Sequence, residues 1–166
     1  MLFRSDLYVV DSASEIITEG VDGGDDTIES SVSRTLGSNI ENLRLTGSVN
    51  LSGVGNTLAN SITGNSGANT LQGLAGNDIL IGGGGTDTLS GGDNDDLLVG
   101  GSGNDVFDGG TGIDTVSFRS AAGPISVDLS ITLSTQNTGQ GQDRLVGIEN
   151  VLGSDTASDK IGRAHV

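Results

Sequence analysis

The sequence predicts an all-β fold, a parallel β-solenoid built from repeats of nine residues. Three observations within residues 55 to 117 predict it: a glycine, an apolar residue and an Asn or Asp each keep one position of a nine-residue register. The first position is Gly55, Gly64, Gly73, Gly82, Gly91, Gly100 and Gly109, and the eighth is Ile62, Leu71, Leu80, Leu89, Leu98, Phe107 and Val116. A flexible glycine-rich linker, the alternative for so polar a segment, has no reason to keep this order.

Each repeat divides into a strand and a turn. Positions seven to nine predict a three-residue strand with one inward side chain, the apolar eighth residue. Positions one to six predict a turn, because glycine permits positive φ and close backbone approach. Two repeats return the chain to its starting point, so residues eighteen apart stack at the spacing of neighbouring strands. The predicted architecture is a parallel β-roll with a thin core of stacked aliphatic side chains.

Composition restricts the class of protein further. The 166 residues include 29 glycines, no cysteine and 2% aromatic residues, and the formal net charge is −15. Little large apolar surface is present, so a conventional two-layer core is not expected. The absence of cysteine excludes disulfides and thiolate sites, and the acidic charge argues against nucleic acid or an anionic membrane as a partner. An acidic chain of this kind suits cations.

The sixth position of the register carries the chemistry. It is an amide in the first two repeats and a carboxylate in the next five, in the order Asn60, Asn69, Asp78, Asp87, Asp96, Asp105 and Asp114. In the predicted roll the five aspartates alternate between two edges, and stacked carboxylates about 5 Å apart repel by roughly 3 kcal/mol at an effective dielectric constant of about 20. A cation between them is therefore expected. Ca²⁺ fits best, because Mg²⁺ wants a tighter octahedron and Zn²⁺ or Cu²⁺ wants His or Cys ligands.

Three repeats match a known pattern in full. "GGGGTDTLS", "GGSGNDVFD" and "GGTGIDTVS" follow G-G-x-G-x-D-x-apolar-x, so residues 73 to 117 resemble the repeats-in-toxin (RTX, haemolysin-type) calcium-binding family, and residues 55 to 72 resemble degenerate members. The resemblance implies several Ca²⁺ ions between stacked turns, held by sixth-position carboxylates and glycine carbonyls. It names as ligands Asp78, Asp87, Asp96, Asp105 and Asp114, with carbonyl donors among Gly83, Gly85, Gly92, Gly101, Gly103, Gly110 and Gly112.

Two repeats depart from this pattern, and two lack the acid. Leu74 stands at a second position and Asn94 at a fourth position, where each must adopt a turn conformation that favours glycine. Asn60 and Asn69 offer only neutral oxygens. For these two turns we expect an amide ladder that closes the roll without metal.

The flanks are β-like but lose the nine-residue period. We expect an irregular β segment at residues 1–54, the roll at 55–117, a β-rich flank at 118–160 and a non-native tail at 161–166, "IGRAHV", which breaks the composition and matches the translation of a sequencing-adapter-like string. Asp6 and Tyr8 occupy the sixth and eighth positions of a further repeat, and "SNIENLRLTGS" resembles the later "VGIENVLGSD". Such alternation suggests a fragment of a longer repeat array.

The predicted function is a calcium-binding module without catalysis of its own. Zinc-protease, serine-hydrolase and Walker motifs are absent from the sequence, and we expect neither a membrane span nor a cleavable N-terminal export signal. The family resemblance implies a secreted, extracellular protein that passes through type I secretion machinery and folds where calcium is abundant. Two alternatives stay open at this point: an accessory domain of a secreted protease, lipase or polysaccharide epimerase, and a metal-independent structural solenoid of a surface adhesin.

Overall fold

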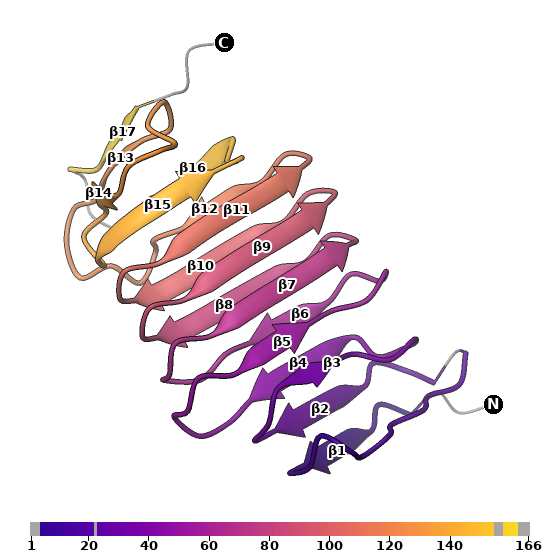
Figure 1. Cartoon of the computed structure of the whole chain (residues 1–166). Coiled ribbons are helices and arrows are strands. Elements are labelled where there is room, and N and C mark those ends of the chain that lie inside the picture. The colour runs from indigo at the N-terminus through magenta and orange to yellow at the C-terminus, as the bar shows by residue number, and fades with distance from the viewer. Residues whose placement is uncertain (1–3, 22, 155–157, 163–166) are drawn as a thin grey trace.

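The computed structural model describes residues 4–21, 23–154 and 158–162, and these residues form strands and turns without a helix. Figure 1 shows a stack of strands that runs from the N-terminal to the C-terminal end of the chain. Nearly all strand pairs are parallel, and from β2 to β12 strands in sequence order alternate between two sheets. The predicted parallel β-roll is confirmed.

Within the described ranges, the first sheet has eight strands and the second has seven. In spatial order the first contains β1 (Leu7–Val10), β2 (Thr27–Ser30), β4 (Asn42–Leu45), β6 (Ser61–Thr63), β8 (Ile79–Gly84), β10 (Leu97–Ser102), β12 (Thr115–Ser117) and β16 (Asn150–Leu152). The second contains β14 (Gln136–Asn137), β15 (Gln142–Val146), β11 (Val106–Thr111), β9 (Thr88–Asp93), β7 (Thr70–Ala75), β5 (Ser52–Val54) and β3 (Arg34–Thr35). A separate pair joins β13 (Ser126–Asp128) to β17 (Lys160–Gly162).

The pairing register has the predicted period. Leu80 of β8 pairs with Leu98 of β10, and Leu89 of β9 pairs with Phe107 of β11, each pair being eighteen residues apart. All seven eighth-position side chains have an exposed fraction of 0% and belong to one core cluster. A core this thin gains its stability from contacts between successive turns, as in other solenoids.

The strands are longer than the three residues predicted. In β7 to β11 each strand spans six residues, because the first three positions of the next repeat continue the pairing. Gly101 pairs with Gly83 and Ser102 with Gly84, for example. The prediction that positions one to six are all turn was therefore wrong: in these repeats the strand runs through the first three positions, and the non-strand part is the fourth to sixth.

Leu74 and Asn94, which stand where the repeat pattern has glycine, adopt the positive φ that was expected to strain them. Leu74 has a φ of 86° and Asn94 a φ of 81°, so both lie in the left-handed region that L-residues disfavour. Asn tolerates this region better than Leu, because its short polar side chain bonds locally. The Leu74 side chain is 47% exposed, so packing offsets little of its strain.

The stack continues on both sides of residues 55–117. β2 and β4 extend it towards the N-terminus, and β15 and β16 extend it towards the C-terminus, after an excursion between β12 and β15. The related "IEN" segments begin equivalent strands, since Asn42 opens β4 and Asn150 opens β16. Of the tail expected to be non-native, residues 163–166 lie outside the described residues. Among the described residues, no helix is long and apolar enough to span a membrane.

Candidate metal centre

The sixth-position aspartates form two carboxylate ladders, one along each edge of the roll. The first ladder is Asp78, Asp96 and Asp114, and the second is Asp87 and Asp105. In each step the backbone N–H of one aspartate donates to Oδ1 of the next, at 2.7 Å from Asp78 to Asp96 and 2.9 Å from Asp87 to Asp105. The structure therefore brings the predicted acidic residues together by edge, as the eighteen-residue period requires.

The second carboxylate oxygen of most ladder residues is buried without a partner. The five side chains have exposed fractions between 0% and 3%. Among the described residues, the Oδ2 atoms with no hydrogen-bond partner include those of Asp78, Asp87, Asp96 and Asp114. An ionised carboxylate with an unsatisfied buried oxygen is strongly unfavourable, so each of these atoms calls for a cation or a proton.

The first-position glycines keep open the space beside these oxygens. A Cβ at Gly73 would overlap Oδ2 of Asp78 and would lie 2.7 Å from the carbonyl oxygen of Gly91 in the next turn. Gly82 has the same environment, with Asp87 and the carbonyl of Gly100. A carboxylate oxygen and a carbonyl oxygen from successive turns thus flank one cradle, and hard oxygen donors of this kind fit Ca²⁺.

These first-position carbonyls were missed by the sequence prediction, which named only glycines at the second and fourth positions. The strict recurrence of glycine at the first position was the signal that could have identified them, because no side chain fits beside the carboxylate. Their backbone conformation did not require glycine, since none of the first-position glycines has a positive φ.

The predicted carbonyl donors form columns along the stack. All of them have positive φ: Gly83, Gly85, Gly92, Gly101, Gly103, Gly110 and Gly112. A Cβ at Gly101 would overlap the carbonyl oxygen of Gly83, so this oxygen points at the next turn. Their place between the turns is the one that the prediction requires, and their role as metal ligands stays a prediction.

In the first two repeats, side-chain amide groups form hydrogen bonds within the repeat and to the preceding coil. Asn60 Oδ1 accepts from the backbone N–H of Asn56 at 2.7 Å, and its Nδ2 donates to the carbonyl of Ile40 at 3.1 Å. The Nδ2 of Asn56 donates to the carbonyls of Gly37 and Ile40, both at 2.8 Å. Asn65 and Asn69 repeat the arrangement. The side-chain amides of these turns therefore have hydrogen-bond partners, and closure of the turns without metal stays a prediction.

Two further acids cap the ladders at the C-terminal side. Asp105 N–H donates to Oδ1 of Asp143 at 2.7 Å, and Asp114 N–H donates to Oε2 of Glu149 at 2.8 Å. Glu41 accepts from the N–H of Asp26 in the same way, at 2.9 Å. The sequence analysis missed these roles because Asp143 and Glu149 follow an excursion and lie off the nine-residue register. The repeated "IEN" was the available signal for Glu41 and Glu149.

Burial perturbs the titration of the ladder. Removal from water raises the pKa of the Asp78 carboxyl to about 7, and raises those of Asp96 and Asp105 to about 6. The pKa values of Asp87, Asp114 and Asp143 are also raised, again chiefly by burial. The backbone N–H donors oppose this rise, and neighbouring ladder charges add to it for several members, including Asp78 and Asp96. Without a cation, the roll therefore favours protonated ladder residues.

Acidification is expected to stabilise the metal-free roll. In the unfolded chain these groups titrate near 3.8, but in the fold Asp78 titrates at about 7 and Asp96 and Asp105 at about 6. Between these values the folded chain binds more protons than the unfolded chain, so stability is largest below about pH 4 and is lost as pH rises through about 6 to 7. Far-UV circular dichroism in chelator should show more β structure at about pH 5 than at about pH 8. A content of β structure that rises with pH would contradict the ladder's raised pKa values.

Comparison with known proteins agrees with the geometry. The family model described as the RTX calcium-binding nonapeptide repeat, in four copies, matches residues 54–89 and 81–116. A search among curated proteins found no match to the chain. The matched residues include both carboxylate ladders, the glycine cradles and the first amide turns. Residues 54–116 of this chain therefore belong to the RTX calcium-binding nonapeptide repeat family.

Proposed function

We propose that this chain is a calcium-triggered folding module of a secreted protein. Ca²⁺ ions are bound between successive turns by the ladder carboxylates and glycine carbonyls. The observation that carries the proposal is the set of buried Oδ2 atoms without partners on Asp78, Asp87, Asp96 and Asp114. Calcium satisfies these atoms and cancels the repulsion along each ladder, so binding free energy becomes folding free energy.

The same chemistry gives the proposed switch. Without calcium the ionised ladder destabilises the roll, and the chain stays largely unfolded. Extracellular calcium modules bind at about 10⁻⁴ to 10⁻³ M, so a module of this class folds in the millimolar calcium found outside cells. The family resemblance supports an extracellular location and export through type I secretion machinery before folding. Any catalytic activity belongs, in this proposal, to other parts of the protein that carries the module.

The first test is a calcium titration of the whole chain, begun in chelator and followed by far-UV circular dichroism. We expect a cooperative transition from coil to β structure with Ca²⁺, and a much weaker response to Mg²⁺, which prefers a tighter octahedral site. A spectrum that is already β-rich in chelator near neutral pH, and indifferent to Ca²⁺, would overturn the proposal and would favour a metal-independent solenoid.

A further inference from the structure

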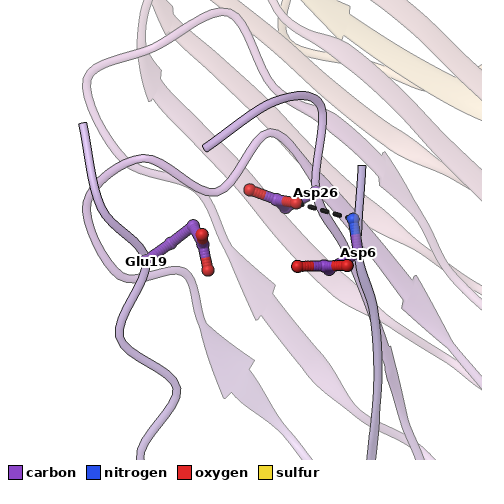
Figure 2. A group of neighbouring side chains, drawn as sticks. All are labelled: Asp6, Glu19 and Asp26. Atoms are coloured by element: carbon purple, nitrogen blue, oxygen red, sulfur yellow. Dashed lines mark hydrogen bonds between the residues drawn. The ribbon is translucent and has the colours of Figure 1, made fainter. Parts of the chain in front are cut away.

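A second acidic cluster lies outside residues 55–117, near the N-terminal end of the stack. Asp6 immediately precedes β1, Asp26 immediately precedes β2, and Glu19 comes from the segment that connects these strands. Parallel pairing of the two strands fixes the first two residues: Thr27 N–H donates to the carbonyl of Asp6 at 2.9 Å, and Asp6 N–H donates to Oδ1 of Asp26 at 2.8 Å. Figure 2 shows the three carboxylates gathered around one space.

Asp26 is the member whose environment points to a ligand. Its side chain has an exposed fraction of 0%, and its Oδ2 has no hydrogen-bond partner. In Figure 2 this carboxylate extends towards the space that Asp6 and Glu19 also face. Within the described ranges, no lysine or arginine nitrogen pairs with any of the three acids; the ion pair found there joins Arg44 to Glu29. A buried carboxylate oxygen beside two further acids requires a positive charge.

The geometry points to a bound divalent cation, and we propose that Asp6, Glu19 and Asp26 form a Ca²⁺ site separate from the carboxylate ladders. One oxygen from each residue lies within 4.8 Å of the other two. Three oxygens at this limit would lie about 2.8 Å from a common centre, so a small contraction gives the 2.3–2.6 Å of Ca²⁺ coordination, whereas the 2.0–2.1 Å of Mg²⁺ needs a larger one. An all-oxygen donor set does not select Zn²⁺ or Cu²⁺.

Gly23 leaves the centre of this site accessible. A Cβ at this position would lie 2.6 Å from Oε1 of Glu19 and 3.1 Å from Oδ2 of Asp26, so a methyl group would intrude between the two oxygens. Gly23 does not have a positive φ, so its backbone accepts alanine without strain. Asp6 is exposed, and water from that side completes the coordination shell.

Tyr8 supplies a reporter for this site alone. Its hydroxyl donates to Oε2 of Glu19 at 2.7 Å, and this hydrogen bond raises the pKa of Tyr8 to about 12. The chain has one tyrosine and no tryptophan. Light absorbed by tyrosine therefore excites a luminescent lanthanide efficiently only when the ion binds close to Tyr8.

The test uses Tb³⁺ as a calcium analogue, with tyrosine-excited Tb³⁺ emission and far-UV circular dichroism recorded in the same titration. We expect saturable emission that Ca²⁺ displaces. Asp26→Asn and Glu19→Gln each remove one charge while keeping a hydrogen-bond acceptor. Each should raise the Tb³⁺ concentration at half-maximal emission by at least about tenfold. Gly23→Ala should also raise this Tb³⁺ concentration, although it changes no charge. Asp11→Asn, at an exposed acid close by in the chain, is the matched control and should leave emission unchanged.

The outcomes separate this site from the calcium-triggered folding of the roll. Emission that is absent from a β-folded wild-type chain, or that survives both Asp26→Asn and Gly23→Ala, overturns the site even if circular dichroism shows calcium-driven folding. Emission lost in these variants but retained in Asp11→Asn supports the site even if circular dichroism does not respond to calcium. Retained β structure in the variants shows that loss of emission reflects loss of the ion.

Discussion

Asp87→Asn is expected to change the stability of the roll in opposite directions with and without calcium. Oδ1 of Asp87 accepts from the backbone N–H of Asn69 at 2.7 Å, and an asparagine oxygen can replace this acceptor. The substitution removes a buried charge, so the metal-free fold should become more stable. It also removes a carboxylate ligand, so the calcium midpoint of folding should rise by at least about tenfold, or about 1.4 kcal/mol.

Circular dichroism measures the two effects, through the calcium midpoint of folding and through the content of β structure in chelator. Asp87→Ala is a useful contrast, because it loses the acceptor for Asn69 and should destabilise the fold in both conditions. Asp108→Asn carries the same charge change at an exposed position on β11 and should alter either measurement little. An unchanged calcium midpoint in Asp87→Asn, together with a loss of stability in Asp87→Ala, would show that the carboxylate contributes as a hydrogen-bond acceptor and not as a metal ligand.

Gly103→Ala is expected to prevent folding even at saturating calcium. Gly103 has a φ of 142°, and a Cβ there would overlap the carbonyl oxygen of Gly85 in the preceding turn. The obstructing atom belongs to the backbone and cannot move without breaking the stack, so we expect a loss of more than about 3 kcal/mol. Far-UV circular dichroism in saturating calcium shows whether the variant folds, and urea unfolding measures the loss if it does.

Gly84→Ala is the matched control for this substitution. Its φ is not positive, and the atom nearest to an added Cβ is the Ser102 side-chain oxygen at 3.5 Å, an ordinary contact. This variant should fold with a stability within about 1 kcal/mol of the parent chain. Equal effects at the two positions would mean that the close approach of successive turns is not what requires glycine.

The repeat register predicted the parts of this protein that depend on short-range periodicity. Glycine, the apolar eighth residue and the sixth-position acid recur every nine residues, and from that spacing alone followed the parallel pairing, the buried stack and the two edges that carry the aspartates. Leu74 and Asn94 were correctly identified as residues that adopt a backbone conformation favouring glycine, although Leu74 lies in β7 and not in a turn.

Features that depend on contacts between distant segments were not predictable in this way. Asp143 meets Asp105 across 38 residues, after an excursion that includes β13 and β14. No local period reports such an insertion, because the chain leaves the stack and rejoins it. The cluster that includes Glu19 was also missed, although Asp6 had been placed at a sixth position. Glu19 lies in an irregular connection, and only the fold brings it beside Asp26.

The asparagine side chains between the first turns give the folding of the roll a direction. Asn56 and Asn65 join their turns to the preceding ones through amide groups, whereas the later turns carry buried carboxylate oxygens without hydrogen-bond partners. In a linear array each unit gains stability only from its neighbours, so the turn that orders first becomes the template for the next. Under the proposed calcium binding, the amide-bonded turns are therefore expected to order without calcium, and calcium is expected to control the addition of the later turns towards the C-terminus.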